Sequence, residues 1–258
     1  MTLSSNQVNE ISLLLLSKLR EKLSRYDPET QNMPFHTRLL GKDRMAVFSF
    51  VQSINTSLGT SIFEQIGAVI ARPNFRRVEH QYSGLGQQIS EQSLIVIQRI
   101  LNELETASTK PNKDQEIKLI FEVSSNPPLV TKKPTRVDLF VESNDGAEYY
   151  FDIKTAKPNI GDFKQYKRNL LEWIALRGTV ASPSDIHTLI AIPYNPYEPA
   201  PYQRWTLQGL YDLKKEVLVA DEFWDFLGGN GTYLELLDLF EKVGMTLRPE
   251  IDSRFSQL

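Results

Sequence analysis

The chain has 258 residues, of which 41% are hydrophobic and 24% charged, with a net charge of −3, which disfavours a non-specific polyanion binder. It contains no cysteine, which excludes disulfide bonds and thiolate metal sites and favours a reducing compartment. No run approaches the roughly 18 apolar residues of a membrane span, and the N-terminus lacks a secretion signal, so we expect a cytoplasmic protein without membrane contact.

Apolar residues recur at helical spacing in four early segments, which predicts helices over residues 6–25, 43–59, 61–72 and 90–105. Asp27-Pro28 ends the first helix, Gly59 ends the second, and Pro73 follows the third. We expect a loop between the first two helices, up to Gly41. Residues 74–88 are polar, with a short strand over residues 78–82.

The later segments predict a sheet. Residues 117–123 are predicted as the first core strand. Residues 136–141 and 148–154 are predicted as a hairpin, because Asp145-Gly146 between apolar runs is a strong hairpin signal. A helix to about residue 177 and a buried strand over residues 187–193 follow. Residues 207–243 are mostly helical, with a break at 228–231. This order predicts a mixed sheet flanked by helices, a compact α/β fold.

The hairpin carries three charged residues within its strands. Side chains alternate along a strand, so Asp152 and Lys154 share one face, about 7 Å apart along the chain. Val137 and Leu139 point to the face opposite that of Asp138. If the polar faces of the two strands coincide, two carboxylates and one ammonium converge on one patch of the sheet.

Asp138, then thirteen residues, then Asp152-x-Lys154, within the predicted order of elements, resembles the motif of the PD-(D/E)XK nucleases. A single chain of this size with helical additions at both ends resembles a type II restriction endonuclease. The resemblance covers residues 60–195. Two positions depart from the motif: Val137 stands in place of Pro, and Asp152 replaces the commoner Glu, which leaves a carboxylate for a metal.

The resemblance implies one nuclease domain over residues 1–258, with an αβββαβ restriction-endonuclease-like core over 60–195 and helical additions over 1–59 and 205–258. It implies Mg²⁺-dependent hydrolysis of double-stranded DNA at a short palindromic sequence by a homodimer, leaving 5′-phosphate ends. Asp138, Asp152 and the Ile153 carbonyl would hold Mg²⁺, which prefers oxygen ligands. Lys154 would position the attacking water and stabilise charge on the phosphate.

Three other interpretations are left open. Asp152 and Lys154 could form an exposed ion pair on an edge strand, since such pairs are common and contribute little. The chain could be another nuclease of this superfamily, acting in DNA repair or junction resolution. It could also be a binding module with an inert site, although an intact set of Asp138, Asp152 and Lys154 argues against inertness.

Glu64, near the start of the helix over residues 61–72, has two interpretations. Type II restriction enzymes often carry an acidic residue on a helix beside the active-site sheet, so the resemblance implies that Glu64 binds metal-bound water or steadies Lys154. Ser61-x-x-Glu64 is also a capping box, in which the Ser61 hydroxyl accepts from the Glu64 amide at the start of a helix.

Basic residues that follow the hairpin are candidates for phosphate contacts. Residues 132–168 hold eight basic and six acidic residues, whereas residues 212–258 hold five basic and ten acidic ones. The candidates for DNA binding are Lys157, Lys164, Lys167 and Arg168, together with Arg204 in a loop that could reach bases. The alternatives are that the three lysines and Arg168 form a solvated helix face, and that Arg204 belongs to a rigid surface loop. Trp224 and Phe226 are interpreted as packing residues or a dimer contact.

Overall fold

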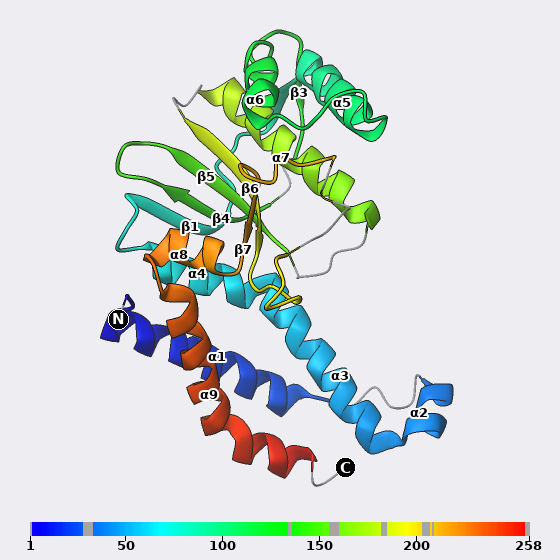
Figure 1. Ribbon diagram of the computed structural model, residues 1–258, viewed down its shortest axis with the longest axis vertical. Helices are drawn as coiled ribbons and strands as arrows, with labels where there is room; N and C mark the ends of the chain where they lie inside the picture. The colour runs from blue at the N-terminus through cyan, green and yellow to red at the C-terminus, as the bar shows by residue number, and fades with distance from the viewer. Residues whose placement is uncertain are drawn as a thin grey trace. The chain divides into compact units, whose positions relative to one another are not determined.

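A computed structural model describes residues 2–27, 33–133, 136–154, 160–181, 185–202, 207 and 209–255 (Figure 1). The chain forms two compact units. A helical unit comprises Met1–Ile70 and Gly228–Leu258, and a sheet unit comprises Ala71–Leu227. The expectation of a single nuclease domain stays a prediction. None of the helices in the described ranges is long and apolar enough to cross a membrane.

The sheet unit is built on five strands in the order β1-β4-β5-β6-β7 (Figure 1). Their bounds are β1 Arg77–Tyr82, β4 Val137–Glu142, β5 Glu148–Ile153, β6 Ile186–Ile192 and β7 Val217–Val219. β1, β4 and β5 pair in antiparallel fashion, whereas β5, β6 and β7 are parallel. A second small sheet pairs β2 (Gln88–Ser90) with β3 (Leu129–Thr131). The predicted mixed sheet is therefore confirmed.

The predicted hairpin joins β4 to β5. Gly146 has a φ of +91°, a left-handed conformation that favours glycine, and its amide donates to the Ser143 carbonyl at 3.0 Å. The turn sets a register in which Leu139 faces Phe151 and Phe140 faces Tyr150. A one-residue slip would turn every side chain of a strand to the other face of the sheet, so this register decides which residues meet.

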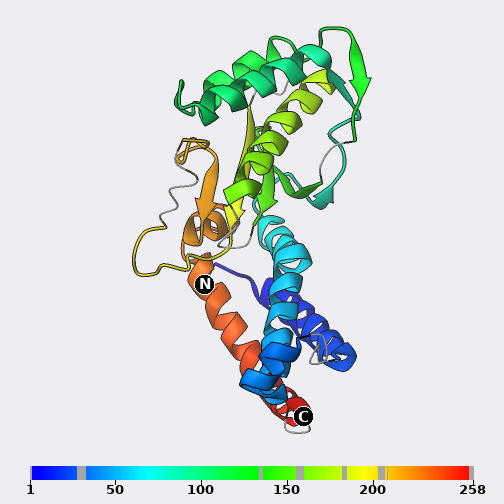
Figure 2. The same ribbon diagram turned by 90° about the vertical axis from the view of Figure 1, so that its right-hand side faces the viewer.

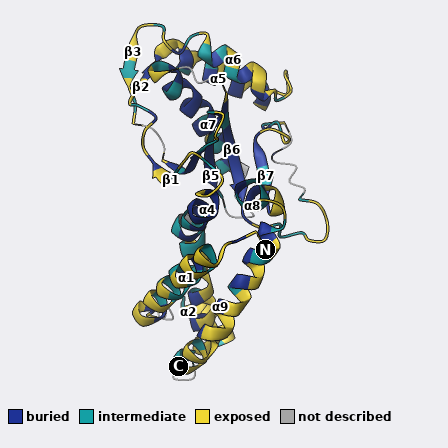
Figure 3. Cartoon of the chain, turned by 90° about the vertical axis from the view of Figure 1, so that its left-hand side faces the viewer, coloured by how far each residue is buried: buried dark blue, intermediate teal, exposed yellow. Residues whose placement is uncertain are grey.

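Helices cover both faces of the sheet. The crossover helix α7 (Ile160–Val180) packs on β6 and contacts α5 (Glu91–Glu105) and α6 (Lys113–Phe121), as Figure 2 shows. On the other face, Phe223 of α8 (Asp221–Gly228) meets Phe151 with ring centroids 5.4 Å apart. Gly178 lets α7 pack closely against the segment that follows α6, because a Cβ at this position would lie 2.5 Å from the Ser124 hydroxyl oxygen. The inner strands β4, β5 and β6 are largely buried between these layers, whereas only one residue of the edge strand β1 is buried (Figure 3).

Two elements of the sheet unit differ from the sequence predictions. The predicted strand over residues 117–123 is wrong, because this segment belongs mostly to helix α6. Asn112 caps this helix by accepting from the Gln115 amide at 3.1 Å. The buried positions of α6 are Lys113, Glu116 and Ile120, which have helical spacing, but two of them are charged and so disguise the pattern. The outer antiparallel strand is instead β1, as the polar segment 78–82 had suggested. The three-residue strand β7 was not predicted.

The helical unit contains α1 (Ser5–Arg25), α2 (Pro34–Leu40), α3 (Lys42–Ser57), η1 (Leu58–Ile62), α4 (Phe63–Ala71) and α9 (Thr232–Phe255). The prediction of a helix over 6–25 is confirmed, whereas the loop expected up to Gly41 contains α2. The predicted break at residues 59–61 is wrong, because the π-helical turn η1 joins α3 to α4. The Ser61 hydroxyl donates to the Ser57 carbonyl at 3.3 Å. No helix begins at Ser61, so the capping-box interpretation of Glu64 is wrong.

Candidate active site

The β4–β5 register brings the two aspartates of the hairpin together. Extending the pairing of Leu139 with Phe151 by one residue places Asp138 opposite Asp152, with both side chains on the same face. Asp152 shares this face with Tyr150, whose ring packs 4.9 Å from Phe140. The site lies at the carboxyl ends of β5 and β6, where open sheets of this kind commonly place their ligands.

Hydrogen bonds and ion pairs hold the charged groups of the site in place. Asp138 Oδ2 accepts from the Ile153 amide at 2.8 Å, which crosses the hairpin. The Lys154 ammonium pairs with Asp152 Oδ1. The guanidinium of Arg136 lies 3.4 Å from Asp138 Oδ1. The structure therefore brings Asp138, Asp152 and Lys154 together, as the alternation of side chains had predicted.

Asp152 is in an unusual electrostatic position. The residue is 3% exposed, and burial, together with the nearby Asp138, raises its pKa to about 7 despite the attraction of Lys154. Burial alone would lower the pKa of Lys154, but the two carboxylates outweigh it and raise that pKa. Asp152 Oδ2 is buried and accepts no hydrogen bond. A buried carboxylate oxygen without a partner is costly unless something else compensates it.

These donors fit a hard divalent cation. Two carboxylates face one another, one of them has an uncompensated oxygen, and Ile153 lies beside both. Oxygen-only donors of this kind suit Mg²⁺, which binds through one or two carboxylates and keeps several waters. Within the described residues, no cluster of three or more His, Asp or Glu side chains suits a metal ion.

The predicted DNA-binding residues have different environments. Lys164 and Arg168 are partly exposed on α7, where Lys164 pairs with Glu105 and Arg168 donates to Gln98 at 2.5 Å. Lys167 is fully buried, and its ammonium contacts Glu116 at 2.6 Å and Glu216 at 2.6 Å. The expectation that Lys167 contacts phosphate is therefore wrong. Lys157 and Arg204 lie outside the described residues.

Two other residues singled out in the sequence are buried. Glu64 lies in α4 of the helical unit and is 3% exposed. Trp224 is buried in the sheet unit, where its indole donates to the Pro193 carbonyl at 2.8 Å. The interpretation of Trp224 as a packing residue is therefore confirmed, whereas a dimer contact through its ring is not compatible with its burial.

Sequence reasoning missed two neighbours of the site, Arg136 and Tyr166. Arg136 could have been found, because it precedes Asp138 by two positions, and alternation places both on one face. Tyr166 gave no such signal, since it fits the apolar pattern of its helix. In the structure the Lys154 ammonium lies 4.6 Å from the centre of the Tyr166 ring.

Comparisons with known proteins identify the family of this chain. Residues 3–244 match the family described as "Type II restriction endonuclease, HinfI". The type II restriction enzyme HgiCII of Herpetosiphon aurantiacus is 28% identical over 230 residues, which cover 86% of this chain and 81% of the relative. HgiEI of the same organism is 27% identical over 228 residues, covering 87% and 81%. MjaII of Methanocaldococcus jannaschii is 26% identical over 284 residues, covering 99% and 74%. The chain therefore belongs to the HinfI family of type II restriction endonucleases, and it is a site-specific nuclease, as its resemblance to that class implied.

Proposed function

We propose that this nuclease hydrolyses phosphodiester bonds of double-stranded DNA at a short palindromic sequence, using Mg²⁺ and leaving 5′-phosphate ends. The observation that supports the proposal most strongly is the pair of facing carboxylates, Asp138 and Asp152, with Lys154 on the same side of the sheet. The relatives HgiCII and MjaII, named as type II restriction enzymes, support the reaction class.

In the proposed mechanism, Asp138, Asp152 and the Ile153 carbonyl would hold the cation. When bound, Mg²⁺ supplies Lewis acidity toward the phosphate and lowers the pKa of a coordinated water. The high pKa of Asp152, about 7, means that proton and cation compete for the same carboxylate, so cation binding favours its ionised form. Lys154 donates hydrogen bonds to the attacking water and to the phosphate oxygen on which charge develops.

The rest of the chain would position the substrate. Among the residues that the structure describes, Lys164 and Arg168 of α7 are the candidates for phosphate contacts. Lys157 and Arg204 remain proposals from the sequence. Each chain carries one set of Asp138, Asp152 and Lys154, so cutting both strands of a palindrome in one binding event calls for two copies. We therefore propose a homodimer with two-fold symmetry that matches the symmetry of the site. A cytoplasmic location also stays a prediction.

The proposal is tested by incubating the protein with plasmid DNA and Mg²⁺ and sequencing the ends that form. We expect discrete fragments that share one short palindrome and carry 5′-phosphates. Progressive loss of DNA from free ends would instead identify an exonuclease, and intact plasmid at every Mg²⁺ concentration would identify a binding module.

Substitutions in the hairpin then test the assignment of the site. Asp138→Asn, Asp152→Asn and Lys154→Gln should each abolish cutting while leaving the far-ultraviolet circular dichroism spectrum unchanged. Asp145→Asn is the matched control, because Asp145 lies in the turn of the same hairpin and is fully exposed. Cutting by Asp152→Asn at the rate of the parent protein would overturn the assignment of the site.

A further inference from the structure

Tyr166 is the aromatic residue that lies against the ammonium of Lys154. Its ring centre is 4.6 Å from Lys154 Nζ, a distance at which the negative face of an aromatic ring attracts a cation. Tyr166 comes from α7, whereas Lys154 directly follows the last residue of β5. The contact therefore joins the sheet to its crossover helix at the candidate active site.

A second contact matters for Lys154 because its side chain is long and its ion pair is with Asp152, a residue of the strand that Lys154 itself follows. A lysine ammonium is a point charge on a flexible four-carbon stem, with three donors that can rotate among acceptors. Its carboxylate partner is Asp152 Oδ1, on the same strand end. Among the residues that the structure describes, this is the ion pair of Lys154, and one ion pair lets the ammonium rotate about the carboxylate. The Tyr166 ring lies over the ammonium from another element, α7, and so provides a second contact that can limit this rotation.

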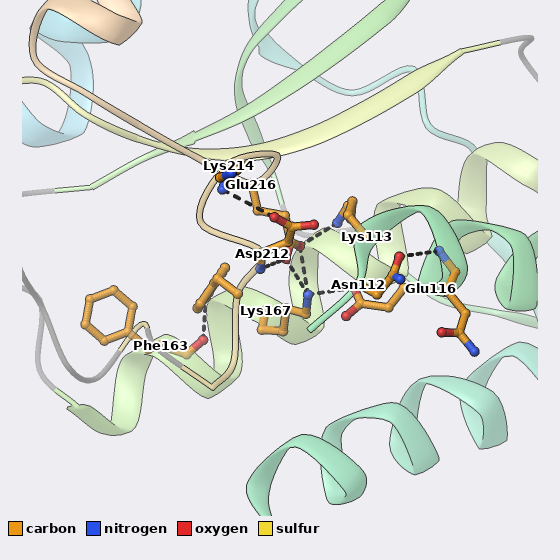
Figure 4. A network of polar contacts seen from close by, with 10 residues as sticks. Asn112, Lys113, Glu116, Phe163, Lys167, Asp212, Lys214 and Glu216 are labelled. Carbon is orange, nitrogen blue, oxygen red and sulfur yellow. Dashed lines mark hydrogen bonds and ion pairs between the residues drawn. The ribbon is translucent and has the colours of Figure 1, made fainter. Parts of the chain in front are cut away.

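The residue after Tyr166, Lys167, belongs to a buried ion cluster that anchors this turn of α7 (Figure 4). Lys167 has no exposed surface and donates to Glu116 at 2.6 Å and to both oxygens of Glu216, at 2.8 and 2.6 Å. Lys113 of α6 also donates to Glu216, at 2.7 Å. The cluster holds two lysines and two glutamates, so it ties α7 to α6 and to the segment before β7 with balanced charge.

The first turn of α7 has a second anchor. The Tyr211 hydroxyl donates to the Phe163 carbonyl at 2.6 Å, and the Tyr211 ring centre lies 5.5 Å from Lys167 Nζ. Phe163 is fully buried and meets the Tyr166 ring edge-on at 6.1 Å between centroids. Residues on both sides of Tyr166 are therefore fixed, so its ring has a defined position from which to restrain Lys154.

We propose that Tyr166 is a positioning residue that holds the Lys154 ammonium in the orientation used for phosphodiester hydrolysis. This inference rests on the proposed role of Lys154 in that reaction. Tyr166 acts through the face of its ring, so its hydroxyl group is dispensable.

Two substitutions at Tyr166 separate the ring from the hydroxyl. Tyr166→Phe keeps the ring face, whereas Tyr166→Leu keeps an apolar side chain but removes the π system. Under single-turnover conditions with plasmid DNA and Mg²⁺, we expect Tyr166→Leu to cut roughly 3- to 30-fold more slowly than the parent. This is the fold-change in rate that follows if the free energy of an ordinary cation–π contact is added to the activation barrier. Tyr166→Phe should cut within about twofold of the parent rate. DNA affinity should be unchanged in both variants.

A double-mutant cycle and a spectroscopic measurement make the test specific. In a Lys154→Gln background, Tyr166→Leu should cause no further loss of rate, because the two residues act as one unit. In protein labelled with ¹³C-lysine, the ε-methylene protons of Lys154 should show an upfield ring-current shift, assigned by its absence in Lys154→Gln. That shift should persist in Tyr166→Phe and disappear in Tyr166→Leu.

The outcomes distinguish this inference from the proposed function. Normal cutting by Lys154→Gln would remove Lys154 from the reaction, and the proposed function of the site would fail with it. If Lys154→Gln is inactive but Tyr166→Leu cuts at the parent rate, only the role of Tyr166 is overturned. Equal slowing by Tyr166→Phe and Tyr166→Leu would also overturn it, because the hydroxyl rather than the ring would then be required.

Discussion

Replacing Lys167 by methionine should strongly destabilise the sheet unit. Lys167→Met keeps the length of the side chain but leaves Glu116 buried without its ammonium, and it leaves Glu216 with the Lys113 ammonium and the Asp212 amide. Breaking a buried ion pair by removing one partner costs about 3–5 kcal/mol, because a charge stays buried without compensation. All atoms of Lys167 are buried, so solvent does not screen this loss.

Lys164→Met provides a matched control on the same helix. Lys164 pairs with Glu105, but the two side chains are 41% and 40% exposed. Exposed pairs of this kind contribute roughly 0–1 kcal/mol. The two variants remove the same charge from neighbouring turns of α7, so the difference between them measures burial. We expect the two free energies of unfolding to differ by at least about 2 kcal/mol.

Urea unfolding followed by tryptophan fluorescence is a suitable assay, since all three tryptophans, at positions 173, 205 and 224, lie within the sequence of the sheet unit. DNA affinity measured against salt concentration provides a second readout, because each lost phosphate contact reduces the slope by about one. Two results together would refute the buried cluster and restore Lys167 as a phosphate ligand. Lys167→Met would be as stable as Lys164→Met, and its DNA affinity would depend less steeply on salt concentration than that of the parent protein.

Three further predictions follow from other contacts. Arg168→Ala should bind DNA with a salt dependence reduced by about one phosphate contact, whatever the DNA sequence, and an unchanged slope would remove Arg168 from the interface. Glu64→Gln should fold normally and cut more slowly if its carboxylate serves catalysis, whereas Ser61→Ala should cost less than about 0.5 kcal/mol in urea, because Ser61 caps no helix. Burial opposes ionisation of Glu148, but hydrogen bonds from Arg177 at 2.7 and 2.8 Å outweigh it and lower the pKa of Glu148. The stability that this carboxylate contributes is therefore present above pH 4.5 and is lost on acidification, so Glu148→Gln should show a shallower fall in stability below that pH.

The sequence contained enough information to locate the candidate site because that site depends on local rules. Asp145-Gly146 defines the hairpin, the hairpin defines the register, and alternation then places Asp138, Asp152 and Lys154 on one face. No contact between distant segments was needed to reach this arrangement. The same reasoning applied to Arg136 would have added it to the group.

The elements that were wrongly predicted depend on contacts between distant segments. Helix α6 buries Lys113 and Glu116, and this is favourable only because Lys167 and Glu216, some 50 and 100 residues away in sequence, neutralise them. A hydrophobicity pattern therefore does not show these positions as buried. Lys167 was assigned to a solvated or DNA-facing side for the same reason. At residues 59–61, Gly59 suggested a helix end, but the backbone continues through a π-helical turn.

The central claim, that Asp138 and Asp152 together hold a divalent cation, can be tested without measuring cleavage. Mn²⁺, which binds oxygen donors and is paramagnetic, can be titrated into the protein mixed with the DNA that the parent enzyme cuts. Electron paramagnetic resonance then measures the free ion. We predict that the parent protein and Asp145→Asn bind Mn²⁺ alike, whereas the double variant Asp138→Asn/Asp152→Asn loses this binding while still binding DNA. Undiminished Mn²⁺ binding by the double variant would contradict the account.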